Sequence, residues 1–237
     1  MTYFKAVHMD GTDFYTGTVR WLPPVGKPLP EGGLIIRHPT AHKRTTGDAA
    51  HYLSVATVPT DCTGMGWPCR LARDKRTRAA VWQPDPDGLP NKAASWQWRV
   101  VEELDATLTL GPQGREVAAL IERAARLTDD EVAGLATAWY ATGDDAWYAA
   151  RYTTRDAADD AARYAAWSAT GVAAWDAARY TTRDAADDAA RYTTRDAARY
   201  AVWYAAKALT VRDLISTEHY DTLTRPWASV IGLTEKN

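Results

Sequence analysis

A repeat of four residues runs through the second half of the chain and limits what that half can fold into. From Asp144 to Lys207 the sequence divides into sixteen consecutive tetrads, such as YAAR, YTTR and DAAD, and almost every middle pair is Ala or Thr. Ala is the strongest helix former, and no common β-solenoid has a four-residue period, so the tetrads predict α-helix. Four residues exceed one helical turn, so the small residues wind around the helix, which disfavours a long straight coiled coil.

A longer repeat of 28 residues lies over the tetrads. Its markers are five Trp and two Gly residues: Trp139, Trp147, Trp167, Trp175 and Trp203, with Gly143 and Gly171. The large outer residues of the tetrads form ridges beside grooves of Ala and Thr, which favours helices that cross near about −50°. We therefore predict an alanine-rich helical repeat bundle or short α-solenoid, with a single unbroken helix as the alternative.

The helix boundaries follow from capping and turn residues. Thr128 and Glu131 have the spacing of a capping box that opens a helix. Gly143 and Gly171 are candidate turn points, and Pro226 suits the start of a short C-terminal helix. The predicted longer helices cover residues 115–127, 129–141, 144–168 and 172–209.

The part before Gly111 has the pattern of a small, mostly β domain. Asp10 and Gly11 suit the tight turn of a hairpin over residues 3–19. Further strands are predicted over residues 34–37, 52–58, 69–73, 79–83 and 95–104. In the last of these, Trp96, Trp98 and Val100 alternate onto one face. The predicted fold class is α+β, with a β-rich domain over residues 1–111 and the helical repeat domain over residues 112–237.

The charge and hydropathy of the chain exclude some functional classes. Charged residues make up 24% and the net charge is −2, so nothing in the whole chain indicates a nucleic-acid partner or an acidic membrane surface. The longest aliphatic run is far shorter than a membrane span, and no signal peptide is recognisable at the start. We predict a cytoplasmic protein in which Cys62 and Cys69 are free thiols.

The β domain contains three groups of residues with potential chemistry. His38, His42 and His51 precede Cys62 and Cys69, but their spacing matches no standard zinc site, so we expect neither a metal nor a cofactor. A basic cluster with Trp67 and Trp82 nearby is explained by a solvated hairpin tip, so nucleic acid is disfavoured as a partner. Its members are Arg70, Arg73, Lys75, Arg76 and Arg78.

Two segments of the β domain carry a resemblance to known proteins. With YFKAVHMDGTDF near the start, VVEELDATLTLGPQG near its end and the tetrads after it, the chain resembles proteins of actinobacteria and their phages over nearly its whole length. The segment ARYAVWYAAKAL is also similar to immunity proteins of bacterial toxin systems. The resemblance implies a phage or bacterial conflict system, and host cytoplasm as the location if the chain is phage-encoded.

A looser likeness concerns the third group, which comprises His8, Ser54, Glu102 and Glu103. Their order along predicted strands resembles the mono-ADP-ribosyltransferase pattern, in which a Ser supports the nicotinamide pocket and a Glu orients the acceptor. No E-x-E motif is present, and adjacent Glu102 and Glu103 are expected on opposite faces of a strand. An ADP-ribosyltransferase-like enzyme is therefore the alternative to a non-catalytic function.

The aromatic and Arg residues of the tetrads are the candidates for binding. Trp, Tyr and Arg dominate binding hot spots, and a repeat scaffold presents them on an extended surface. The predicted set comprises Trp147, Tyr148, Arg151, Trp167, Trp175, Arg179 and Trp203. We predict a non-catalytic protein-interaction or structural module that binds a protein partner, or a second copy of itself, through these repeats.

Overall fold

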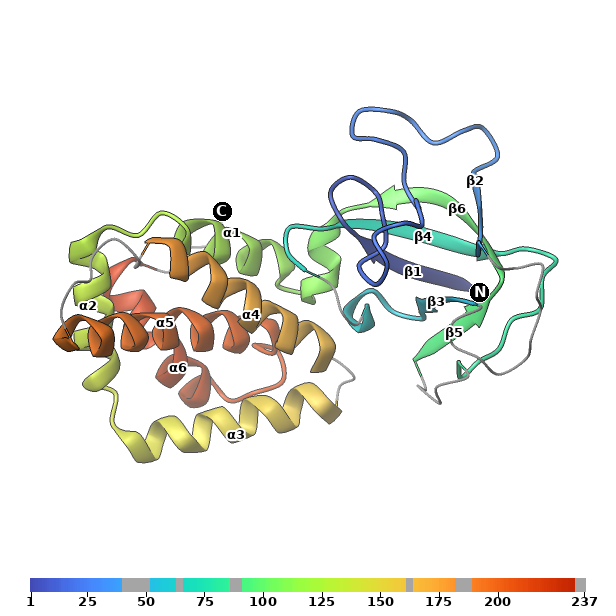
Figure 1. Ribbon diagram of the computed structural model, residues 1–237. Coiled ribbons are helices and arrows are strands. Elements are labelled where there is room, and N and C mark those ends of the chain that lie inside the picture. The colour runs from blue at the N-terminus through green and yellow to red at the C-terminus, as the bar shows by residue number, and fades with distance from the viewer. Residues whose placement is uncertain (40–51, 63–65, 86–90, 161–163, 182–188, 233–237) are drawn as a thin grey trace. The chain divides into compact units, whose positions relative to one another are not determined.

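The structure, a computed structural model, describes residues 1–39, 52–62, 66–85, 91–160, 164–181 and 189–232. The chain divides into two compact units, Met1–Thr109 and Leu110–Asn237. The first, the β unit, contains a six-stranded sheet in its described residues, and the second, the helical unit, contains six α-helices in its described residues (Figure 1). The predicted α+β class is thereby confirmed.

The β unit is built on one antiparallel sheet with the strand order β2-β6-β4-β1-β3-β5. The strands are β1 (Thr2–Val7), β2 (Leu34–Arg37), β3 (Leu53–Ala56), β4 (Arg70–Arg76), β5 (Lys92–Ser95) and β6 (Gln97–Leu104). The ladder between β1 and β4 is continuous from Thr2 to Val7, whereas β1 and β3 share the single pair Phe4 and Ala56. The sheet is therefore less tightly joined between β1 and β3.

One face of the sheet carries the main core of the β unit. Tyr3, Val7, Trp98 and Val100 are at most 1% exposed and belong to one cluster of packed side chains. The indole N–H of Trp98 donates to the backbone oxygen of Leu53 over 2.9 Å, so this buried polar group is satisfied. The predicted alternation onto a buried face is confirmed for Trp98 and Val100, whereas Trp96 lies before β6 and is only partly buried.

Two strand predictions in the β unit are wrong. The expected hairpin has no second strand: after the turn at Gly11 (φ +89°) the chain forms isolated bridges only. The carboxylate of Asp13 accepts hydrogen bonds from the backbone N–H groups of Thr16 and Val19, which are then not available to a partner strand. Residues 79–83 also form one bridge, between Trp82 and Ala94, and no strand. The strand beside it is β5, which the sequence analysis did not predict.

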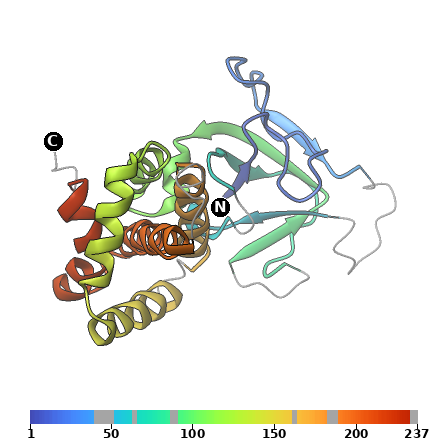
Figure 2. The same ribbon diagram turned by 60° about the vertical axis from the view of Figure 1, so that its left-hand side comes forward.

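The helical unit consists of helices that surround α5. The helices are α1 (Gly114–Ala124), α2 (Asp129–Tyr140), α3 (Asp144–Asp160), α4 (Tyr164–Thr181), α5 (Ala189–Thr210) and α6 (Thr217–Val230). Each of the other five contacts α5, which lies in the middle of them in both ribbon views (Figures 1 and 2). Four alanines of α5 are at most 3% exposed: Ala197, Ala198, Ala201 and Ala205. These small residues let neighbouring helices approach α5 closely.

The helix boundaries agree with the sequence where a cap defines them. Thr128 accepts a hydrogen bond from the backbone of Glu131, whose side chain accepts from the backbone of Thr128, which confirms the capping box. Gly143 has φ +82° between α2 and α3, which confirms a turn there. Cys62 and Cys69 are free thiols, as predicted, and the structure shows that both are buried.

The predicted turn at Gly171 is wrong. The predicted helices over residues 144–168 and 172–209 are also wrong, as is the alternative of a single unbroken helix, because the structure has α3, α4 and α5 in this part of the chain. Helix α4 continues through Gly171, where a Cβ would overlap Trp203 and Lys207 of α5. The absence of a side chain therefore allows close helix packing rather than a turn. The boundary at Pro226 is wrong too: α6 begins after the cap Ser216 and continues through the proline, because that stretch of α6 buries its apolar face.

Candidate functional site

Aromatic side chains from the end of α2 and the start of α3 meet because of the turn at Gly143. Trp139 is near the end of α2, and Trp147 and Tyr148 lie in the first two turns of α3. The centroids of the Trp139 and Trp147 rings are 5.2 Å apart, and those of Trp147 and Tyr148 are 4.9 Å apart, both in edge-on arrangements. These are the distances at which aromatic pairs attract each other.

Helix α5 adds further rings to this group. Tyr200 and Tyr204 are one turn apart on α5, and both stack on Trp139, with centroids 5.8 and 5.7 Å from it. On α4, Trp175 meets Tyr200 edge-on at 5.3 Å, and Trp203 of α5 lies 5.8 Å from Trp175. The seven residues Trp139, Trp147, Tyr148, Trp175, Tyr200, Trp203 and Tyr204 form one network of ring contacts, which we call the aromatic network.

A pocket of about 230 Å³ opens at one end of the aromatic network. Six residues line it: Trp139, Tyr140, Gly143, Trp147, Tyr148 and Tyr200. Tyr140 is 65% exposed and Tyr148 is 49% exposed, so the pocket has a solvent-facing rim above more buried rings. We call it the aromatic pocket. Its lining is suited to one flat or apolar group of a ligand, since five of the six lining residues are Trp or Tyr.

The surroundings of the aromatic network are electropositive. The Arg151 guanidinium lies 5.4 Å from the Trp147 ring, and that of Arg199 lies 5.4 Å from the Trp175 ring. Burial lowers the pKa of Arg199, and the positive charges of Arg195 and Arg179 lower it further, whereas Asp196, whose carboxylate lies 3.4 Å from the Arg199 guanidinium, raises it. A negatively charged ligand beside these guanidinium groups would be attracted by them.

Lys207 is a buried amine beneath the aromatic network. Its Nζ is 3.5 Å from the Trp167 ring centroid and 4.1 Å from that of Trp203, and the residue is 6% exposed. Burial lowers its pKa to about 7, with further lowering by Arg151 and Arg155. The apolar rings thus surround an amine that is partly uncharged at neutral pH.

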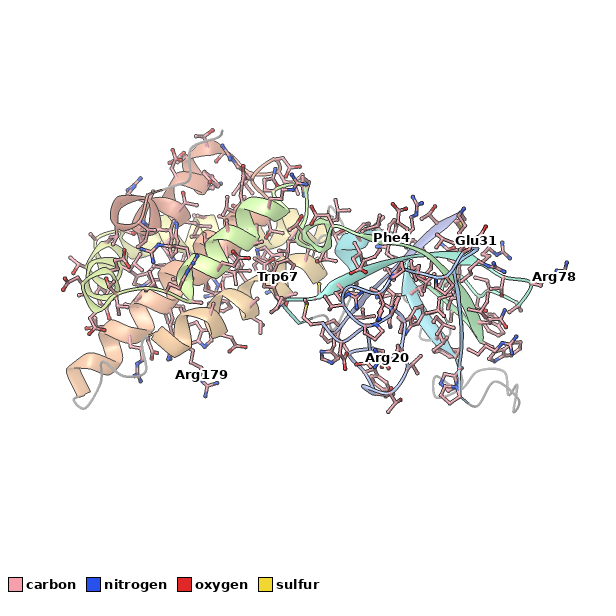
Figure 3. All side chains as sticks on the ribbon, turned by 90° about the horizontal axis from the view of Figure 1, so that it is seen from above. Phe4, Arg20, Glu31, Trp67, Arg78 and Arg179 are labelled. Atoms are coloured by element: carbon pink, nitrogen blue, oxygen red, sulfur yellow. The ribbon has the colours of Figure 1, made fainter. Side chains whose placement is uncertain are left out.

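The structure brings together most of the sequence-predicted binding residues. Trp147, Tyr148, Trp175 and Trp203 belong to the aromatic network, and Arg151 lies against it. Trp167 is buried in a separate cluster with Ala158 and Val211. Arg179 is exposed, with its side chain directed away from the helices (Figure 3).

Three aromatic residues of the pocket were not predicted to bind: Trp139, Tyr140 and Tyr200. Tyr200 is the first residue of a tetrad, so the repeat gave a usable signal for it. Tyr140 precedes the tetrads, and only the turn at Gly143 places it beside Tyr148. That turn changes the direction of the chain and brings Trp139 and Tyr140 beside Trp147 and Tyr148.

The residues of the enzymatic alternative lie on different strands. Ser54 is on β3, and Glu102 and Glu103 are on β6, with β1 and β4 between these two strands. Glu103 makes a bidentate ion pair with Arg70, at 2.6 and 2.7 Å, and Glu102 pairs with Arg73. The two carboxylates therefore neutralise two members of the basic cluster.

The remaining candidates of the β unit do not form a metal site in the part of the chain that is described. No group of three or more His, Cys, Asp or Glu residues is placed there to hold an ion, and His42 and His51 lie outside the described residues. His8 packs against Phe14, with ring centroids 4.1 Å apart. Burial raises the pKa of the Cys62 and Cys69 thiols to about 11, so neither is a thiolate near neutral pH.

Arg76 and Arg78 of the basic cluster are exposed, and Arg78 extends away from the sheet in Figure 3.

Within the described ranges, no helix has both the length and the apolar character that crossing a membrane requires. Comparison with protein-family models, with curated proteins and with solved structures finds no match for this chain.

Proposed function

We propose that the helical unit is a non-catalytic protein-interaction module that receives one side chain of a partner in the aromatic pocket. The observation that carries the proposal is the pocket itself: five Trp and Tyr residues around about 230 Å³, with Tyr140 and Tyr148 exposed at its rim. Trp and Tyr supply large contact areas at a low cost in conformational entropy, and both are enriched at binding hot spots.

The charges around the pocket favour an acidic partner. Arg151 lies against a pocket ring, and the positive charges of Arg179 and Arg195 act on Arg199, which pairs with Asp196. An acidic segment would be attracted by these groups, which would speed its association and make binding sensitive to salt. The proposed partner therefore offers an apolar or aromatic side chain for the pocket, flanked by Asp or Glu.

We extend the proposal to the biological setting on the sequence resemblance alone. Likeness to actinobacterial and phage proteins and to toxin-immunity proteins suggests a partner within a phage or bacterial conflict system. In that setting the tetrads build a helical repeat bundle that serves as the scaffold of the pocket. A second copy of the chain is the other candidate partner, and sedimentation at increasing protein concentration distinguishes it from a different protein.

The test is selection of random displayed peptides on the full-length protein, followed by affinity measurements on variants. Tyr148→Ala removes a pocket wall, whereas Tyr152→Ala removes a ring of similar exposure from the same helix, one turn away and outside the pocket. We expect acidic peptides with one large apolar residue, at least tenfold weaker binding to Tyr148→Ala and unchanged binding to Tyr152→Ala. Equal affinities for wild type and Tyr148→Ala would exclude the pocket as the binding site.

A further inference from the structure

A second pocket, unrelated to the proposed interaction module, lies in the β unit where β1 and β3 are joined by a single residue pair. Its volume is about 270 Å³, near the lower end of the range for small-molecule sites. The lining residues that matter here are Phe4, Lys5, Phe14, Tyr15, Cys62 and Lys92. Ser54, a candidate of the enzymatic alternative, also lines the pocket, whereas none of the predicted partner-binding residues does.

Two lysines from different strands contribute to the lining. Lys5 is on β1, and Lys92 is on β5 opposite Ala56, where its side chain is 6% exposed. The Lys5 amine donates to the backbone oxygen of Ser54 over 3.0 Å and lies 5.4 Å from the Trp21 ring centroid. Two largely buried amines in one cavity are uncommon, because each positive charge has lost water and repels the other.

The neighbouring carboxylates act on these amines without direct ion pairs. No carboxylate of the described residues pairs with Lys5 or Lys92, but the charges of Asp13 and Asp74 raise the pKa of Lys5, and those of Asp61 and Asp85 raise the pKa of Lys92. Burial lowers the pKa of both amines, and the charge of Lys92 lowers that of Lys5 further. Burial also raises the pKa of Asp74 and Asp61.

Aromatic residues form the outer side of the pocket. Tyr15 is 94% exposed, and Phe14 is partly buried against His8. The loop that carries both is fixed by Asp13, whose carboxylate accepts hydrogen bonds from the backbone of Tyr15, Thr16 and Val19 at 2.6 to 3.0 Å. The rim is thus held in place before any ligand arrives, which lowers the entropic cost of binding.

We propose that this pocket binds a small organic anion, with its carboxylate or phosphate between the Lys5 and Lys92 amines and a flat body against Phe4, Phe14 and Tyr15. Charge-assisted hydrogen bonds from the two amines replace the missing counter-charge. Aromatic rings at the rim cover the unsaturated part of the ligand. Cys62 is a neutral wall of the site, since its thiol is not ionised.

The proposal is tested by chemical-shift titration of the full-length protein with benzoate, phenyl phosphate, inorganic phosphate and benzamide. Benzamide has the shape of benzoate without its charge. We expect benzoate or phenyl phosphate to bind with a Kd below roughly 1 mM and to shift the amides of Ala6 and Val55, with benzamide at least tenfold weaker. Comparison of the two aromatic anions identifies carboxylate or phosphate as the preferred group, and weaker inorganic phosphate indicates a contribution from the rings.

Variants test the role of the amines. Lys92→Met is expected to weaken binding at least tenfold, while Lys75→Met, which changes an exposed lysine on β4, leaves it unchanged. Three results would each overturn the proposal. The first is equal affinity for benzamide and benzoate, and the second is no binding of benzoate or phenyl phosphate up to roughly 10 mM. The third is a folded Lys92→Met variant that binds the anions as tightly as wild type does. The benzoate and benzamide comparison uses wild-type protein, so it decides the matter even if the variant does not fold.

Discussion

Substitution of Gly171 by Ala tests the packing of α4 on α5. In an isolated helix this change would stabilise by about 1 kcal/mol, because Gly is a poor helix former. Here the added Cβ would lie 2.6 Å from Cδ1 of Trp203 and still closer to its Nε1 and to Cε of Lys207. Lys207 can move its flexible end, but the Trp203 ring is held by Trp175 and Tyr204.

Overpacking of this kind costs about 3 kcal/mol at the upper end of its usual range, so the net effect of Gly171→Ala is a loss of about 2 kcal/mol. For a unit of this size the melting temperature falls by roughly 8 °C. Gly134→Ala is the matched control: its Cβ would meet Cγ1 of Val230 at 3.2 Å, near the end of α6, where the side chain has room to shift.

The assay is thermal and urea unfolding of full-length protein, followed by circular dichroism at a helix wavelength. We expect Gly134→Ala to match or exceed the stability of wild type by up to about 1 kcal/mol. If Gly171→Ala is as stable as Gly134→Ala, the close approach of α4 and α5 at this glycine is refuted.

Two further predictions concern the helical unit. The pKa of Lys207 is lowered from 10.5 to about 7 in the folded protein. Between these two pH values the amine is protonated in the unfolded chain and largely deprotonated in the folded one. The free energy of unfolding therefore rises with pH in that window, by at most about 5 kcal/mol. Lys207→Met should remove this rise when the free energy of unfolding is compared between pH 7 and pH 9.5. That range lies below the one in which Tyr204, whose pKa is raised to about 12, lowers stability with rising pH. An equal pH dependence in wild type and variant would contradict the burial of the amine. Thr128→Ala should lose about 1 kcal/mol of stability through loss of the cap of α2, whereas Thr137→Ala, exposed in the last turn of the same helix, should lose none. Urea unfolding that gives the two variants equal stability would argue against the capping box.

Local signals in the sequence predicted local structure well. The capping box at Thr128 and the turn at Gly143 depend on a few neighbouring residues, and both are present. Gly171 has the same place as Gly143 in the 28-residue repeat, yet it lies inside a helix. The difference arises from Trp203 and Lys207 of α5, whose side chains pack directly against Gly171 although they are distant from it in sequence.

The two identical copies of AARYTTRDAADDAARY agree wherever both are described. The described parts of the first copy lie in α3 (residues 149–160) and at the start of α4 (Tyr164), and those of the second lie in α4 (residues 177–181) and α5 (residues 189–192). Identical sequences have identical helix propensities, and each position described in both copies is helical. Strand β5 was missed because Lys92 follows the Pro-rich sequence PDPDGLPN and pairs with a strand far along the chain.

The candidate sites were predictable in unequal measure. Trp147 and Tyr148 were identified because their residue types and their places in the repeat are visible in the sequence. Lys5 and Lys92 were not, because an isolated lysine in a strand gives no sign of burial, and only the pairing of β1, β3 and β5 brings the two amines to one pocket.

The central claim is that the aromatic pocket is where a partner binds, and the side-chain N–H signals of the eleven Trp residues test it most directly. Each indole gives one signal in a nitrogen-labelled sample, and selected peptide is added to the full-length protein. The account predicts that the signals of Trp139 and Trp147 shift, while those of Trp21 and Trp98 in the core of the β unit do not. Saturable binding that leaves Trp139 and Trp147 unchanged would contradict it.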